Sequence, residues 1–542
     1  MIKKTVSISM GDGVNLATDV YLPDEDGKYP ALLIFTPYGR KNKKIFADML
    51  VPQKYALVVQ DVRGRYDSGG QYDPIYQERT DAPETIDWIA GQPWYDDNCG
   101  MGVIGISYLA AVGLICAAKR PEHIRTMTNV GGFADTYDIS HRGGALVLHH
   151  LLPWSILTSF SPQPDLQDIN WNEVYCTLPL EEAAEAAGFD NTLWRSWSQS
   201  SVRDVKWESM SLVDLLPDVD IPILHATGWY DLCLGTTLSL YDYFSRNSDK
   251  PQHLFVGPWT HNGVLMGPEQ LHGVEFGPES RPNVPEHIGK WFARWLKEGP
   301  TAEKAAASME LTADDNPVAV FMTDENKWVK DQCWPPRGTE TVEYYLHGDS
   351  LTEDVPSDEG SRSYTHDPDQ PLLSEGGAVW EFPIANLNPG PADQSNLYTR
   401  DDILLFTSEQ LSEEISICGP VQCVLHAATD GRTTDFVAKL VDIDGNGAAR
   451  YVCDGIVRAH LRNDDSKVQP VQPGRTYKDE IDMLSAAHTF AEGHRVGLEI
   501  SSSNFPKWDR NLNSLDGKKR QAQQAVFWGK DDSSKICLPV VK

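Results

Sequence analysis

The sequence has no apolar run long enough to span a membrane, so we expect no membrane-embedded segment. It is also poor in positive charge, with 47 Lys and Arg residues against 78 Asp and Glu residues and a formal net charge of −31. Because nucleic-acid binding needs a local excess of Lys and Arg, this balance argues against a nucleic-acid partner. No glycine-rich phosphate loop or dinucleotide fingerprint occurs, and no cofactor is expected.

The nine cysteines lack the paired CxxC spacing that indicates a zinc site. Their odd number in a long chain favours reduced, mostly buried thiols. The first ten residues contain two lysines without a following apolar stretch, so they do not have the pattern of a secretory signal. We therefore expect a cytoplasmic protein.

Two short segments resemble metal sites and are better explained otherwise. Residues 442–447 match the first half of a calcium loop, but Cys453 stands where that loop needs a bidentate Glu, which favours a hairpin turn. The adjacent His149 and His150 have no partner ligands at useful spacing, so packing or surface placement is preferred to metal binding. No metal is expected.

A chain of 542 residues is too long for one hydrophobic core. Its first half alternates continuous apolar runs with helix-like segments, which predicts a mostly parallel sheet covered on both faces. The predicted strands are Ala31–Phe35, Ala56–Val62, Gly102–Ile106, Ile124–Val130, Ile221–Ala226 and His253–Val256.

Two regions depart from this alternation. Residues 135–218 have helical patterning and several tryptophans, and they predict a helical cap inserted into the core. Each of those tryptophans is expected to serve packing before ligand contact. From about residue 315, short β-rich runs between turn residues, beginning with Val318–Met322, predict a C-terminal jelly-roll β-sandwich at 315–542. The α/β core would then consist of residues 1–134 and 219–314.

Ser107 lies directly after a predicted buried strand and at the start of the predicted helix Tyr108–Lys119. A serine on such a strand-to-helix turn projects its hydroxyl over the sheet edge, as in the nucleophile elbow of α/β-hydrolases. The motif departs from G-x-S-x-G because Leu109 replaces the second glycine. The alternative is a serine that merely caps the helix.

Asp231 and His261 follow the next two predicted strands of the core, in Gly-Trp-Tyr-Asp231 and Gly-Pro-Trp-Thr-His261. Loops at the carboxyl ends of strands are where open α/β sheets place their active sites. The chain order Ser, acid, His is also that of α/β-hydrolases. The sequence therefore predicts a catalytic triad of Ser107, Asp231 and His261, in which His261 removes the serine proton and Asp231 orients the imidazole.

A triad of this kind needs donors for the oxyanion of the tetrahedral intermediate. One candidate is the backbone N–H of Tyr108, directly after the nucleophile. The second should come from the loop after the strand Ala31–Phe35, where Tyr38 offers a phenol and no Gly-Gly run is present. A tyrosine that only packs in the loop is the alternative.

These residues and others around them resemble the CocE/NonD family of hydrolases (cocaine esterase-like), which is related to the X-Pro dipeptidyl peptidases and the α-amino-acid ester hydrolases. The resemblance covers nearly the whole chain. The motifs that carry it are Thr-Pro-Tyr38, Asp-Val-Arg-Gly-Arg65, Ser-Gly-Gly70, Glu-Thr-Ile-Asp-Trp88, Gln-Pro-Trp94, Gly-Ile-Ser107-Tyr, Gly-Trp-Tyr-Asp231, Gly-Pro-Trp-Thr-His261 and Ser-Ser-Ser-Asn-Phe-Pro506.

The resemblance implies an α/β-hydrolase domain with an inserted helical cap and a C-terminal jelly roll. It also implies that the Tyr38 hydroxyl joins the Tyr108 amide in the oxyanion hole, and that Trp154 in the cap contacts the acyl group of the substrate. Cys233 and its two leucine neighbours stand where related α-amino-acid ester hydrolases carry carboxylates, so an α-amino ester is less expected. Ile139 replaces an expected aromatic residue, which argues against cocaine itself.

The X-Pro peptidases carry an additional N-terminal domain, whereas the first predicted strand of this chain starts near Thr5, so peptidase activity is disfavoured. The leading hypothesis is a serine carboxylesterase that hydrolyses small or medium acyl esters. An acylase that cleaves an amide such as a β-lactam side chain is the nearest rival. A non-catalytic binding protein, with the β-rich half as its working part, is the third reading, and the sequence leaves a homo-oligomer open.

Overall fold

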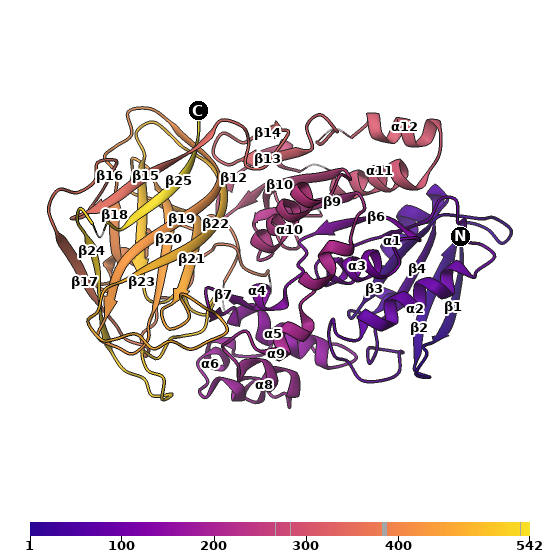
Figure 1. Ribbon diagram of the computed structural model, residues 1–542, viewed down its shortest axis with the longest axis horizontal. Helices are drawn as coiled ribbons and strands as arrows, with labels where there is room; N and C mark the ends of the chain where they lie inside the picture. Colours follow the sequence, from indigo (N-terminus) through magenta and orange to yellow (C-terminus); the bar gives the residue numbers. More distant parts are fainter. Residues whose placement is uncertain (266, 282, 310, 382–386, 532) are drawn as a thin grey trace.

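The computed structural model describes residues 1–265, 267–281, 283–309, 311–381, 387–531 and 533–542. Among these residues the chain forms an α/β domain, a helical insertion and a β-rich C-terminal domain (Figure 1). The N-terminus lies at the outer edge of the α/β domain and the C-terminus lies in the β-rich domain. No described helix combines the length and apolarity that a membrane crossing requires.

The α/β domain is built on one mixed sheet with the strand order β1-β2-β4-β3-β5-β6-β9-β10-β13-β14. Its inner strands from β4 to β13 run parallel, and antiparallel pairs close both edges. The bounds are β1 (Ile2–Ser9), β2 (Asn15–Leu22), β3 (Ala31–Thr36), β4 (Ala56–Asp61), β5 (Met101–Val103), β6 (Ile124–Val130), β9 (Ile223–Tyr230), β10 (Gln252–Thr260), β13 (Val318–Met322) and β14 (Lys327–Asp331).

Helices pack on this sheet because its central strands are apolar on both faces. Every residue of β3 and β4 is buried, for example. The helices of the domain are α1 (Lys44–Leu50), α2 (Glu78–Ala90), α3 (Tyr108–Lys119), α10 (Leu234–Asn247), α11 (Val284–Leu296) and α12 (Pro300–Ala307). The most deeply placed of them is α3, whose residues from Tyr108 to Ala117 are all buried.

The insertion after β6 forms a small helical layer with its own apolar core. Its elements are α4 (Thr136–Ser140), β7 (His141–Arg142), β8 (Ala145–Leu146), α5 (Leu148–Ser159), α6 (Trp171–Tyr175), α7 (Ala183–Ala186), α8 (Thr192–Ser198) and α9 (Val205–Met210). Trp171 and Trp194 are buried in that core, as expected for packing residues. In Figure 1 the insertion lies next to both the α/β domain and the β-rich domain.

The C-terminal domain is an extended set of hydrogen-bonded strands that enclose one apolar core. The strands are β15 (Thr339–His347), β16 (Ser350–Thr352), β17 (Gly360–His366), β18 (Leu404–Thr407), β19 (Ile415–Thr429), β20 (Asp435–Ile443), β21 (Ala449–Arg458), β22 (Tyr477–Phe490), β23 (Arg495–Ser501), β24 (Ala522–Trp528) and β25 (Lys535–Val541). Residues 444–447 form the turn between β20 and β21, which confirms a hairpin in place of a calcium loop.

The prediction that Val318–Met322 belongs to the C-terminal β-sandwich is wrong. This strand, β13, pairs in parallel with β10 and continues the sheet of the α/β domain, and β14 pairs with it at the edge. All five residues of β13 are buried, so its apolar run looks the same in sequence whichever sheet it joins. The pairing partner, which lies more than 60 residues earlier in the chain, decides its place.

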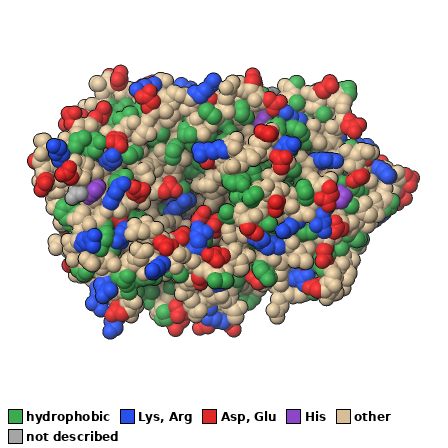
Figure 2. Space-filling model, in the orientation of Figure 1, with side chains coloured by type: hydrophobic (Ala, Val, Ile, Leu, Met, Phe, Trp, Pro, Cys, Tyr) green, Lys and Arg blue, Asp and Glu red, His purple; other side chains and the backbone are tan. Residues whose placement is uncertain are grey.

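The acidic side chains on the face shown in Figure 2 are not gathered into one patch. Figure 2 shows Asp and Glu side chains interspersed with Lys and Arg side chains over that face.

All nine cysteines are free, in agreement with the expectation of reduced thiols.

Candidate active site

Ser107 lies on a strained turn between the sheet and helix α3. Its backbone has φ 55° and ψ −127°, a conformation that is costly for any residue other than glycine. Gly105 permits the turn, because a Cβ atom there would lie 2.2 Å from the carbonyl oxygen of Thr128. Leu109, which departs from the elbow motif, points into the apolar core and is 4% exposed. The second glycine of the motif is therefore not required here.

Asp231 follows the end of β9 and is completely buried. Its carboxylate accepts hydrogen bonds from the Thr227 hydroxyl at 2.9 Å and from the backbone N–H of Cys233 at 2.8 Å. A carboxylate buried with these donors is held as an oriented acceptor. Gly131 makes room for it, since a Cβ at that position would lie 2.9 Å from the Asp231 carboxylate.

His261 joins the serine to the aspartate. Its Nδ1 lies 2.7 Å from Asp231 Oδ1, and its Nε2 lies 3.1 Å from Ser107 Oγ. The structure thus brings together the three residues that the sequence singled out, from positions as far apart as 107 and 261. Burial alone would lower the pKa of His261, but the neighbouring Asp231 and Cys233 outweigh it and hold that pKa well above 6.5.

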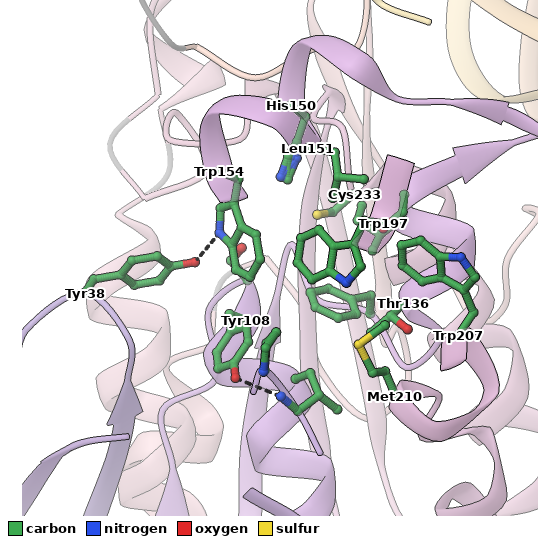
Figure 3. A pocket seen from close by; sticks show the side chains of 16 residues that line it. Tyr38, Tyr108, Thr136, His150, Leu151, Trp154, Trp197, Trp207, Met210 and Cys233 are labelled. Atoms are coloured by element: carbon green, nitrogen blue, oxygen red, sulfur yellow. Dashed lines mark hydrogen bonds between the residues drawn. The ribbon is translucent and has the colours of Figure 1, made fainter. Parts of the chain in front are cut away.

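Tyr38 lies beside this triad and is positioned by the cap. The indole Nε1 of Trp154 donates to the Tyr38 hydroxyl oxygen at 2.9 Å (Figure 3). That bond occupies the oxygen as an acceptor, so the phenolic O–H remains available as a donor. Burial raises the pKa of Tyr38 to about 12, which keeps the phenol protonated at neutral pH.

Tyr108 has two separate roles in the geometry. Its backbone N–H opens helix α3 and has no partner within the helix. Its side chain anchors the elbow, because the hydroxyl donates to Glu78 at 2.5 Å and accepts from the backbone N–H of Ile75 at 3.0 Å. Burial raises the pKa of Glu78 to about 7.

A pocket opens above the serine between the sheet and the cap (Figure 3). It is walled mainly by apolar and aromatic side chains, which suits an apolar ligand group. Ser107, Tyr38 and Cys233 line its sheet side. The other side chains that line it include Ile75, Phe133, Ile139, His150, Leu151, Trp154, Trp197, Trp207 and Met210.

Tryptophans form much of the cap wall. The rings of Trp154 and Trp197 are stacked, with centroids 5.7 Å apart and an interplanar angle of 14°. Trp207 lies against Trp197 with a centroid distance of 5.9 Å. Trp154 and Trp197 pack in the cap and also line the pocket, so their contact with the substrate stays a prediction.

The β-rich domain also reaches the site. Both carboxylate oxygens of Glu381 lie 3.0 Å from the backbone N–H of Asn262, and one accepts from Gly263 at 3.3 Å. These amides directly follow His261, so Glu381 holds the loop that carries the histidine. Burial raises the pKa of Glu381.

The neighbouring histidine pair, His149 and His150, packs against side chains and backbone of the cap and the β-rich domain. His149 is buried, and its Nε2 accepts from the backbone N–H of Trp380 at 2.8 Å. His150 lies in the pocket wall between Trp154 and Trp380, at centroid distances of 6.5 and 5.2 Å. Sequence reasoning placed Cys233 near the substrate through the family resemblance, but it missed Thr227 and Glu381 as parts of the site, because no local motif marks them.

Comparison with known proteins shows which family the chain resembles. Residues 12–263 match the model of the X-Pro dipeptidyl-peptidase (S15) family, and residues 312–536 match the X-Pro dipeptidyl-peptidase C-terminal non-catalytic domain. The chain is 30% identical to cocaine esterase of Rhodococcus sp. (strain MB1 Bresler), over 100% of this chain and 99% of the relative.

Solved structures share the fold over the full length. An aminopeptidase from a marine sediment Thaumarchaeota archaeon has a TM-score of 0.86 at 22% identity, with 100% of this chain and 96% of that chain covered. An α-amino acid ester hydrolase has a TM-score of 0.84 at 24% identity, with coverage of 99% and 96%. The predicted α/β-hydrolase fold is confirmed, and the reading as a non-catalytic binding protein is set aside. The chain belongs to the cocaine esterase-like (CocE/NonD) family of serine hydrolases.

Proposed function

We propose that this serine ester hydrolase is a carboxylesterase that works through a Ser107–His261–Asp231 triad and a covalent acyl-enzyme. The observation that carries the proposal is the unbroken chain of contacts from Ser107 Oγ to His261 Nε2 and from His261 Nδ1 to Asp231, at 3.1 and 2.7 Å. These are distances at which a proton can pass from a nucleophile to its general base.

In the first half-reaction, Ser107 Oγ attacks the acyl carbon while His261 Nε2 takes its proton. Asp231 accepts from Nδ1–H and stabilises the imidazolium that forms. The Tyr38 hydroxyl and the Tyr108 N–H donate to the oxyanion, and His261 returns its proton to the leaving alcohol. Water then attacks the acyl-enzyme by the same steps in reverse order.

The pocket sets what the acyl group can be. Its walls are apolar and aromatic, and Cys233 rather than a carboxylate follows the catalytic aspartate on the sheet side. No charged side chain of the described lining is placed to pair with a substrate ammonium group. We therefore propose an uncharged acyl group, aliphatic or aromatic, on a small-molecule ester.

The test is hydrolysis of p-nitrophenyl esters from acetate to octanoate by the wild type and by Ser107→Ala. We expect turnover in the wild type and a loss of at least about a thousandfold in the variant. A fluorophosphonate should label the wild type once per chain and leave Ser107→Ala unlabelled. Turnover that survives in Ser107→Ala would refute the triad.

An amide acylase with the same triad is the second candidate, because the oxyanion donors and the base serve ester and amide carbonyls alike. A chromogenic phenylacetamide should be assayed beside the matching phenylacetate ester. We expect the ester to be preferred in kcat/KM. Preference for the amide would move the assignment to the acylase.

A further inference from the structure

Cys233 lies at the catalytic centre although the triad mechanism does not use its thiol. It stands two residues after Asp231, at the start of helix α10, and its side chain is 2% exposed. Its backbone N–H supports the Asp231 carboxylate, and its side chain lines the same pocket as Ser107. In Figure 3 the sulfur atom is directed toward the pocket. A small ion that enters the pocket therefore meets this thiol.

The thiol belongs to a compact set of metal-binding atoms. One carboxylate oxygen of Asp231, the sulfur of Cys233 and one ring nitrogen of His261 all lie within 4.8 Å of one another. Within the part of the chain that the structure describes, no other three His, Cys, Asp or Glu side chains meet this criterion. Sulfur, imidazole nitrogen and carboxylate oxygen are the donor atoms that Zn²⁺ takes in proteins, and thiolates also favour other soft cations.

A metal ion bound to these three side chains would prevent catalysis by the proposed triad. Both ring nitrogens of His261 are in use, Nδ1 with Asp231 and Nε2 with Ser107. A metal ion that binds either nitrogen must displace one of these two hydrogen bonds. The general base is then blocked at Nε2 or separated from its aspartate at Nδ1.

We propose that Asp231, Cys233 and His261 form an inhibitory site for a thiophilic divalent cation, Zn²⁺ or Cd²⁺. The cation enters through the substrate pocket and inhibits the enzyme reversibly. Metal binding exchanges one proton for one metal–sulfur bond. The thiol releases one proton to solvent as the metal–sulfur bond forms, and no oxidation is involved. Water or the Ser107 hydroxyl completes the coordination. The inhibition rests on the proposed triad, whereas the binding does not.

Binding is measured first, by calorimetric titration with Cd²⁺ and by the ultraviolet charge-transfer band of a cadmium–thiolate bond. The proteins are the full-length wild type, Cys233→Ser, Cys233→Ala and a control in which the exposed Cys176 and Cys333 are both changed to Ser. We expect one tight site with a thiolate band in the wild type and in the control. Both Cys233 variants should lose the band and bind at least about tenfold more weakly.

Inhibition is measured next, as the Zn²⁺ and Cd²⁺ concentration that halves ester hydrolysis, relative to the metal-free rate of each protein. We expect competition with substrate, full recovery after addition of a chelator, and a shift of at least about tenfold in the Cys233 variants. Two Cys233 substitutions are used so that one poorly folded variant does not decide the result.

Equal inhibition of the wild type and both Cys233 variants would overturn the proposal, as would a thiolate band that disappears only in the Cys176/Cys333 control. The same holds for a wild type that binds no cadmium at the Cys233 thiol. If the wild type shows a Cys233-dependent band but no esterase activity, the metal site stands and the proposed function fails.

Discussion

The two walls of the active-site pocket are built in different ways. On the sheet side, each reacting group has a fixed polar partner, as in the chain from Ser107 through His261 to Asp231. On the cap side, stacked rings such as Trp154 and Trp197 provide shape and little polarity. Under the proposed function, the sheet side would carry out the reaction and the cap side would select the acyl groups that reach it.

A hydrogen bond joins the two walls. Trp154 of the cap donates to Tyr38 of the sheet side, so the cap also orients the proposed oxyanion donor. If the division of labour is correct, substitutions on the sheet side should lower turnover for all substrates. Substitutions on the cap side should change the ranking of substrates instead.

The largest effect is expected from Asp231→Asn. The amide cannot hold His261 in the tautomer that accepts the serine proton, so kcat should fall about ten-thousandfold for every ester. The matched control is Asp242→Asn, an exposed carboxylate on α10 that pairs with Arg246. Steady-state kinetics with two esters of different length provide the test, and a loss below tenfold would contradict the role of Asp231.

Tyr38→Phe should lower kcat about a hundredfold to a thousandfold, because one donor to the oxyanion is lost while the ring and its packing remain. KM should change little, since the donor acts on the transition state. Tyr76→Phe is the control, because Tyr76 is 55% exposed and lies outside the pocket lining. An unchanged kcat would remove Tyr38 from the oxyanion hole.

The pH dependence of ester hydrolysis tests the protonation state of His261. Burial opposes the imidazolium, but Asp231 and Cys233 hold the pKa of His261 well above 6.5. Only the neutral imidazole accepts the serine proton, so kcat/KM should fall about tenfold per pH unit below that raised pKa. A pH profile with its acidic midpoint at or below 6.5 would contradict this expectation.

The same group should affect stability with the opposite sign. A histidine whose folded pKa is raised stabilises the native state below its unfolded pKa near 6.5, and this stabilisation is lost as pH rises through the folded value. Activity should therefore rise over a pH range in which this contribution to stability falls. Tm measured across the same buffers as the pH profile, for the wild type and His261→Ala, tests the sign.

Trp197→Phe tests whether the cap side of the pocket selects the acyl group. The smaller ring enlarges the pocket, so the preference for longer over shorter acyl chains should rise about tenfold while acetate turnover changes little. Trp194→Phe is the matched control, because Trp194 is buried in the same cap core outside the pocket lining. Both variants should lose Tm, and a selectivity change in both would show that cap stability rather than ring shape is responsible.

The smallest effect is expected from Glu381→Gln. The amide is a weaker acceptor for the N–H groups of Asn262 and Gly263, so the His261 loop should be less well held and kcat/KM should fall several-fold. The ranking of esters should not change. Glu375→Gln, in the same segment, is the control, and equal losses in both variants would argue against a specific role for Glu381.

The sequence was sufficient for the parts of the site that local patterns encode. Ser107, Asp231 and His261 each follow an apolar strand, and the parallel sheet then brings its strand ends together. The sequence was insufficient where partners come from distant packing. Nothing near Glu381 indicates that it meets the loop after His261, and Val318–Met322 was assigned to the wrong sheet because buried strands share one apolar pattern.

Glu381 lies late in the chain although it supports the loop that carries His261. The three residues of the proposed triad all lie within the first 261 residues, but the carboxylate that holds the histidine loop comes 120 residues after His261. Because the chain is synthesised from its N-terminus, the three residues of the proposed triad are made before Glu381. The hydrogen bonds of Glu381 to the amides of Asn262 and Gly263 can form only after that later segment has been made.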